Sequence, residues 1–210
     1  MRLAKENVDD AGFYAWFLIL VRGIMMSSMR IIRILALSGS LRNKSYNSAV
    51  LRAAKTLAPR DVEISLFERL GEIPLFNPDL GDGENFSAVS ELRKQIAQCD
   101  AFLVSSPEYV HGVPGALKNA LDWIVGTGEL DGKSVGIINA TPAIEGAQWA
   151  QQGLIEILNV MSANRVVNGA VLKLDAIRKK VDESGEIIDP STRESIIQCI
   201  EALANAARQT

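Results

Sequence analysis

The chain has 210 residues, of which 48% are hydrophobic and 22% charged, with 16 Gly and 7 Pro. This length and composition are typical of one globular domain with a substantial core, and they exclude disordered, collagen-like and low-complexity chains. Lys and Arg number 22 against 25 Asp and Glu, which gives a net charge of −3. Without a surplus of positive charge, nucleic acid is not expected as the main partner.

The cysteine and histidine content argues against a metal site. The chain has two cysteines, Cys99 and Cys199, and a single histidine, His111. These residues are too few and too widely spaced for a zinc ligand set or a disulfide framework. We therefore expect a metal-free protein of the reduced cytoplasm.

The most apolar stretch, Gly12–Met26, is interrupted at Arg22. It is shorter than the roughly 20 residues of a membrane-spanning helix. A secretory signal begins with basic residues, whereas acidic residues outnumber basic ones at the start of this chain. We therefore expect no membrane association. Met29 directly precedes the first predicted strand, so we expect residues 1–28 to form an N-terminal extension outside the fold and residues 29–210 to form the domain.

Beyond Met29, short β-branched runs alternate with longer amphipathic segments, which is the pattern of βα units around a parallel sheet. Uncharged runs such as AFLVSS predict strands that helices cover on both faces. The predicted fold class is α/β, a single domain with a doubly wound five-stranded parallel sheet. The predicted strands are Ile31–Leu37, Val62–Leu66, Ala101–Ser105, Ser134–Asn139 and Arg165–Val171. The predicted helices are Asn47–Leu57, Ser87–Gln98, Pro114–Val125, Ala147–Met161 and Ser191–Arg208.

Two segments between these elements are predicted to be irregular. Leu70–Phe86 is rich in Gly, Pro, Asn and Asp and is expected to be a surface loop, and Asp175–Asp189 is expected to be a charged excursion. In a doubly wound sheet, ligands bind beyond the carboxyl ends of the strands, where the strand order reverses. The chemistry is therefore expected in the loops after the first, third and fourth strands.

The loop after the first strand has the composition of a phosphate site. A buried strand leads through Ser40, Arg42 and Ser45 to Asn47 at the start of a helix. The helix N-terminus offers free N–H groups, and a guanidinium can bind two phosphate oxygens. In the alternative interpretation, Ser45 only caps the helix and Arg42 is solvated.

Two other phosphate motifs fail in this loop. A P-loop requires a second glycine directly before Lys44-Ser45, and the dinucleotide-binding fingerprint requires three glycines where the loop has one. Glu68 follows the second strand, which is where dinucleotide-binding folds have the acid that binds the ribose, but an isolated acid at a strand end is common. The loop therefore favours a mononucleotide held through one phosphate.

The loop after the third strand runs from Ser105 into a helix that begins near Pro114. Pro107 and Pro114 stiffen it, and Gly112 allows the backbone to approach a flat ligand. Such a loop presents backbone N–H and C=O groups to the polar edge of an aromatic ring. The alternative is a rigid connection with Tyr109 at the surface.

These two loops carry a family resemblance. Gly-Ser-Leu-Arg-x-x-Ser-x-Asn after the first strand, and Ser-Pro-Glu-Tyr-x-x-Gly-x-Pro-Gly-x-Leu-Lys-Asn-Ala-x-Asp-Trp after the third, resemble the NAD(P)H-dependent FMN reductases. That family has a flavodoxin-like fold and includes quinone, azo-dye and chromate reductases. The resemblance covers Met29 to about Arg208.

The resemblance implies the site residues. Those expected to hold the FMN phosphate are Ser40, Arg42, Ser45 and Asn47, and those expected to border the isoalloxazine are Pro107, Glu108, Tyr109 and Val110. Many family members have Asn where this chain has Val110, so only backbone contacts are expected there. The loop after the fourth strand, residues 139–146, corresponds to the far side of the flavin but matches weakly.

The resemblance also implies the activity. NADPH or NADH would give a hydride to the flavin, and a second small molecule, such as a quinone, flavin, azo dye or metal oxyanion, would accept electrons at the same face. His111, as the one histidine, is the only candidate for relaying a proton, and its alternative role is that of a loop residue without a catalytic task. A flavodoxin-like electron carrier or a regulatory flavin module is the main alternative function, although a net charge of −3 is mild for a carrier that docks electrostatically. An esterase-like hydrolase is disfavoured because the chain lacks Gly-x-Ser-x-Gly.

The sequence leaves the preferred nicotinamide nucleotide and the final acceptor open. Family members assemble as dimers or tetramers, so a homodimer or homotetramer is expected. Trp123 is interpreted either as an interface aromatic or as a core residue.

Removal of residues 1–28 is expected to leave activity and melting temperature nearly unchanged, because the first predicted strand begins after Met29 and termini outside a fold are dispensable. Thermal unfolding and turnover of the truncated protein test this expectation. Insolubility, or a melting temperature lower by several degrees, would show that the apolar stretch packs on the domain.

Overall fold

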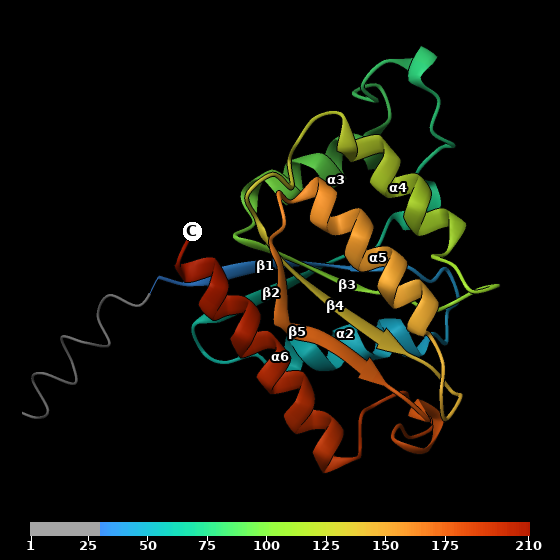
Figure 1. The fold of residues 1–210 in the computed structure, drawn as a ribbon, viewed down its shortest axis with the longest axis vertical. Coiled ribbons are helices and arrows are strands. Elements are labelled where there is room, and N and C mark those ends of the chain that lie inside the picture. Colours follow the sequence, from blue (N-terminus) through green and yellow to red (C-terminus); the bar gives the residue numbers. More distant parts are fainter. Residues whose placement is uncertain (1–29) are drawn as a thin grey trace, which may run out of the picture. The chain divides into compact units, whose positions relative to one another are not determined.

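The computed structural model describes residues 30–210, so the expectation for residues 1–28 lies outside the described part (Figure 1). Residues 32–210 are built around a five-stranded sheet with the order β2-β1-β3-β4-β5, and all four pairs are parallel. The strands are β1 (Ile32–Ser38), β2 (Val62–Phe67), β3 (Ala101–Ser105), β4 (Ser134–Ala140) and β5 (Val166–Leu174). The helices are α2 (Tyr46–Leu57), α3 (Ser87–Gln98), α4 (Gly115–Val125), α5 (Gln148–Met161) and α6 (Pro190–Arg208). The predicted α/β fold class is confirmed.

The two faces of the sheet are covered by different helices (Figure 1). On one face, Ile34 of β1 packs in a core with side chains of α2 and α6, and on the other, Leu35 packs in a core with side chains of α3, α4 and α5. Every residue of β3 and β4 is buried. The uncharged runs in the sequence follow from this arrangement, because a strand covered on both faces has no position for a solvated side chain.

The strand order reverses beside β1. The chain passes from β1 outward to β2 and then returns to β3 on the other side of β1. The connections therefore diverge at the carboxyl ends of β1 and β3, which is where open α/β sheets bind ligands.

The end of the fifth predicted strand was placed too early. The observed β5 continues to Leu174, three residues past the predicted end at Val171, and Leu172–Leu174 pairs with Ile138–Ala140. The register shifts where Val135 pairs with Val166 but Ile137 pairs with Val171. Lys173 interrupts the apolar pattern in the added residues, and only the pairing with β4 identifies them as strand.

Trp123 is a core residue within this chain. Its side chain is 2% exposed, and its Nε1 donates a hydrogen bond to the Pro74 carbonyl at 2.8 Å. Phe76 and Phe86 pack on it edge-to-face, with ring centroids at 5.1 and 5.5 Å. The predicted surface loop over residues 70–86 contains two 3-10 turns, Leu70–Glu72 and Pro78–Leu80, and is anchored through this tryptophan.

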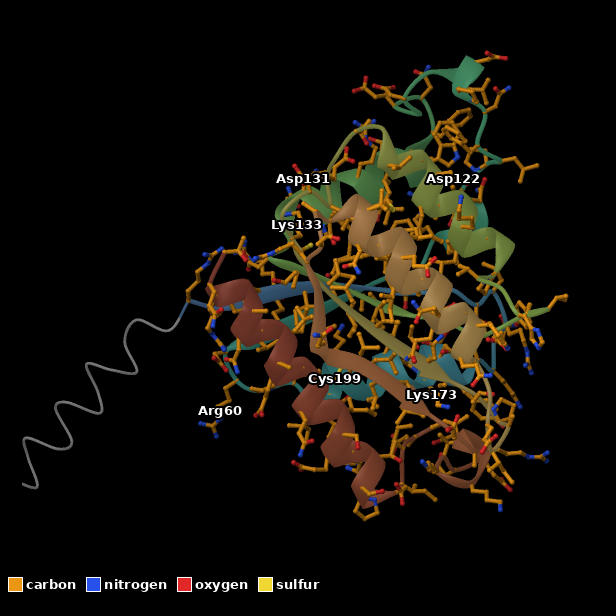
Figure 2. The ribbon with its side chains drawn as sticks, viewed as in Figure 1. Arg60, Asp122, Asp131, Lys133, Lys173 and Cys199 are labelled. Atoms are coloured by element: carbon orange, nitrogen blue, oxygen red, sulfur yellow. The ribbon has the colours of Figure 1, made fainter. Side chains whose placement is uncertain are left out.

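Cys199 lies on α6, on the side of the sheet that this helix covers (Figure 2). Cys99 directly follows α3. Both are free thiols, and burial raises the pKa of each, that of Cys199 to about 12. Both therefore stay protonated at neutral pH and act as small apolar side chains. Within residues 30–210, no helix has the length and apolar character to span a membrane, and no group of three metal-ligating side chains is present.

One buried amide joins three of the elements that surround the carboxyl ends of the strands. Asn47, in the first turn of α2, accepts hydrogen bonds from the Ser105 hydroxyl and the Ala140 N–H, both at 3.0 Å. Its Nδ2 donates to the Ala140 carbonyl at 3.0 Å. Because the side chain is 3% exposed, water cannot replace these bonds. Asn47 therefore fixes the start of α2 against the ends of β3 and β4.

Replacing Asn47 by Ala is expected to lower the free energy of unfolding by about 2 to 4 kcal/mol, because it leaves buried groups of Ser105 and Ala140 without partners. Urea unfolding of the ligand-free protein measures the change. Asn43→Ala is the matched control, since Asn43 is exposed on the preceding loop and its loss should stay within about 0.5 kcal/mol. Equal losses in the two variants would contradict the role of the amide.

Candidate functional site

The loop after β1 turns sharply toward the first turn of α2. Gly39 donates its N–H to the Ser105 carbonyl at 2.8 Å, and a Cβ at Gly39 would lie 2.8 Å from Cδ2 of Leu117. A side chain at this position would displace the buried Leu117, because the loop backbone lies close to α4. Ser45 is the N-cap of α2 and accepts a hydrogen bond from the Ser48 N–H at 3.4 Å. The cap uses the lone pairs of Ser45, and no described group accepts its hydroxyl proton.

The basic side chains near this loop have no counter-ions among the described residues. No carboxylate lies within ion-pair distance of them, and together they line a cavity of about 610 Å³ beside the N-terminus of α2. They are Arg42, Lys44, Arg52 and Arg178. Asp182 and Glu183 also line this cavity, but Asp182 already accepts hydrogen bonds from Ser184 and Glu186. The chain is negative as a whole and locally positive here.

Arg42 also faces a second cavity, of about 460 Å³, on the β2 side of the loop. Ser40 and Glu68 also line this cavity. Residues 38–46 contain no acidic side chain. Hydroxyls, an unpaired guanidinium and a helix N-terminus are donors that fit a phosphate monoester.

The loop after β3 ends in a tight turn. Tyr109 and Gly112 exchange backbone hydrogen bonds at 3.2 and 3.0 Å, and the two residues between them, Val110 and His111, have φ values of 51° and 57°. Positive φ at both central positions is the backbone of a type I′ turn. A β-branched residue is strained in this region, and the Val110 side chain gains no burial there, since it is fully exposed. The positive φ values of this turn therefore lie at Val110 and His111 and not at Gly112.

Glu108 uses its carboxylate to cap a distant helix. The residue before α5, Ala147, has a φ of 60° and provides no side-chain cap. Oε2 of Glu108 instead accepts a hydrogen bond from the Ala150 N–H at 2.8 Å. A carboxylate at a helix N-terminus satisfies a free donor and interacts favourably with the helix dipole. Glu108 therefore holds the loop after β3 against the first turn of α5.

Trp149 lies beside this loop and belongs to neither of the two sequence motifs. This residue lies in the first turn of α5, is 56% exposed, and stacks on His111 with ring centroids at 5.7 Å and an interplanar angle of 29°. A sequence signal existed: the buried face of α5 consists of Ala150, Leu154 and Leu158, and Trp149 does not belong to that stripe.

The loop after β4 is held by backbone hydrogen bonds from the segment that follows β5. Ala143 accepts a hydrogen bond from the Ala176 N–H at 2.7 Å, and Thr141 accepts one from the Ile177 N–H at 3.0 Å. The segment after β5, predicted only as a charged excursion, therefore supports this loop. Ile144, at its tip, is 77% exposed.

The strand order and the all-parallel five-stranded sheet define a flavodoxin-like fold, and open α/β sheets of this kind bind ligands at the carboxyl ends of their strands. The chain matches the NADPH-dependent FMN reductase family over residues 32–175. It is 35% identical to a quinone reductase of Escherichia coli over 169 residues, which is 79% of this chain and 89% of the relative. It is 36% identical to an NAD(P)H-dependent FMN reductase of Pseudomonas aeruginosa over 174 residues, or 82% and 93% of the two chains.

Among solved structures, FerB of Paracoccus denitrificans, a flavoenzyme NAD(P)H:(acceptor) oxidoreductase, is similar with a TM-score of 0.71 and 25% identity, covering 85% of this chain and 98% of that one. The chain belongs to the NADPH-dependent FMN reductase family. It is an FMN-dependent NAD(P)H oxidoreductase, and the resemblance, the flavodoxin-like fold and the cofactors inferred from the sequence are confirmed.

Proposed function

We propose that this oxidoreductase takes reducing equivalents from NADPH or NADH and delivers them through FMN to a small acceptor of the quinone type. The observation that carries the proposal is the convergence of a loop suited to phosphate and a rigid rim at one edge of the sheet. The names of the most similar relatives, a quinone reductase and an FMN reductase, support the acceptor class.

The phosphate of FMN is assigned to the loop after β1. Arg42 has a free guanidinium, and Ser40 and Ser45 add hydroxyls beside the N-terminus of α2. The Asn47 side chain also has a structural task, because its oxygen and one amide hydrogen form hydrogen bonds with Ser105 and Ala140. It fixes the end of the loop, and no described group accepts its second amide hydrogen.

The ring of FMN is assigned to the rim formed by Pro107, Glu108, Tyr109 and Val110. The backbone of this rim is held by the type I′ turn, and the Glu108 carboxylate is engaged at α5. Bound FMN would supply the redox chemistry, accepting a hydride from the nicotinamide and giving electrons to the acceptor. The protein binds and orients the ring and leaves one face accessible. His111 lies on an exposed turn where water can also deliver protons, so we assign it no catalytic role.

The proposal extends to assembly and location. A homodimer or homotetramer is supported by the apolar side chains exposed on the segment between β2 and α3, where Leu75 is 84% and Leu80 is 47% exposed. A cytoplasmic location is supported by the two buried, free thiols.

Arg42→Ala is expected to weaken FMN binding by roughly 10- to 100-fold, because a charge-assisted bond to phosphate contributes about 1.5 to 3 kcal/mol. Riboflavin has the same ring without the phosphate, so its weaker affinity should barely change. Titration of both ligands by flavin fluorescence measures the two effects. Arg60→Ala is the control, since Arg60 is an exposed arginine just before β2, at the opposite edge of the sheet (Figure 2). Equal weakening of both ligands would assign Arg42 to the ring or the fold, and unchanged FMN binding would exclude the loop as the phosphate site.

Steady-state kinetics with varied NADPH and a quinone are expected to give parallel double-reciprocal lines, because the two substrates use the same face of the flavin in turn. Intersecting lines would show that both substrates bind at once, and the shared site would be abandoned.

Reduction of the bound flavin by NADPH alone, followed in a stopped-flow spectrometer, separates this reductase from an electron carrier, in which that step is slow.

A further inference from the structure

A stacked aromatic pair bridges two of the loops at the proposed flavin site. His111 belongs to the turn after β3 and Trp149 to the first turn of α5, and their rings stack at 5.7 Å. Tyr109, in the same turn as His111, is 50% exposed, so three aromatic rings lie at or beside this rim. Large aromatic side chains left in solvent beside a ligand site are typical of a surface that a ligand covers.

The pair is held in place by bonds that do not involve the rings themselves. The hydrogen bond from the Ala150 N–H to Glu108 fixes the turn of α5 that carries Trp149, one residue away. The reciprocal backbone bonds between Tyr109 and Gly112 fix the turn that carries His111. The two anchored backbones fix the positions from which the indole and the imidazole project, and the stack between the rings favours the rotamer of Trp149 that makes this contact.

The backbone conformation of the turn after β3 also indicates a ligand site. Val110 and His111 both have positive φ, and Val110 is β-branched, a residue type that rarely adopts this conformation. A strained turn persists only when surrounding contacts enforce it, and such turns concentrate at ligand sites. Here the conformation places the His111 ring on the Trp149 ring.

We propose that Trp149, positioned by His111, is the docking surface for the flat ring of the electron acceptor and selects planar aromatic acceptors, such as naphthoquinones, over compact oxidants. This inference rests on the proposed function, since it takes the rim after β3 to border the flavin. Stacking on an aromatic side chain requires a flat π-face in the ligand, which a fused-ring quinone has and an octahedral metal complex lacks. Trp149 is then a specificity-determining residue and His111 a positioning residue.

The test compares two anionic acceptors of different shape, the flat 1,4-naphthoquinone-2-sulfonate and the octahedral ferricyanide, and each variant is compared with the parent for the same acceptor. The variants are Trp149→Ala, Trp149→Phe and His111→Ala. Val160→Ala is the control, because Val160 is an 82% exposed side chain toward the other end of the same helix. Calorimetric titration of the oxidised, FMN-loaded protein with the naphthoquinone, in the absence of NADPH, gives a dissociation constant without turnover.

Trp149→Ala is expected to raise the dissociation constant and the KM for the naphthoquinone about tenfold, with kcat and the rate of ferricyanide reduction changed by less than about twofold. Trp149→Phe keeps a smaller ring and should lie between Ala and the parent. His111→Ala should raise the same KM by a smaller factor, and the double variant should lose no more than Trp149→Ala alone, since His111 acts through Trp149. Val160→Ala should match the parent.

Unchanged naphthoquinone binding in Trp149→Ala, with ferricyanide reduction intact, would overturn the inference and leave the proposed function standing. Additive losses in the double variant would show that His111 acts independently and would overturn its positioning role. Failure of the parent protein to bind FMN or to reduce ferricyanide with NADPH would instead contradict the proposed function. If Trp149→Ala does not fold, Trp149→Phe and His111→Ala give the decision, since an unchanged KM in both overturns the inference.

Discussion

The site depends on one buried amide. Asn47 satisfies the Ser105 hydroxyl and both backbone groups of Ala140, so the start of α2 and the carboxyl ends of β3 and β4 form one hydrogen-bonded unit. At the ends of the strands in a parallel sheet, backbone N–H and C=O groups have no partner on the neighbouring strand. When these groups are buried, they need hydrogen bonds from elsewhere in the protein. The loop proposed to hold phosphate lies immediately before Asn47 and therefore starts from a fixed point.

A second constraint joins the loop after β3 to α5. Ala147 cannot cap its own helix, and Glu108 supplies the missing acceptor from a different part of the chain. This single bond makes the position of Trp149 depend on the conformation of the rim. The ligand-facing edge is thus assembled from segments that are far apart in sequence. A side chain of one segment accepts a hydrogen bond from a backbone N–H of another, as Asn47 does from Ala140 and Glu108 does from Ala150.

The electrostatics of the site differ from those of the whole chain. A net charge of −3 gives no reason to expect an anion site. The tertiary structure nevertheless gathers Arg42, Lys44, Arg52 and Arg178 around one cavity, without ion-pair partners among residues 30–210. Local charge, rather than net charge, decides whether a phosphate binds, because the interaction of separated surface charges is screened within about 8 Å at physiological salt.

The sequence by itself determined the α/β class, the alternation of strands and helices, and the two loops that carry the family motifs, because buried parallel strands and helix starts leave local patterns. It determined most boundaries but not the end of β5, since Leu172–Leu174 is strand only through its pairing with β4. The core position of Trp123, the support role of Asn47, the cap by Glu108 and the stack of Trp149 on His111 were decided by the tertiary structure. Each of these features depends on contacts between residues that are far apart in the chain. The sequence around one residue does not show which distant residue it will contact.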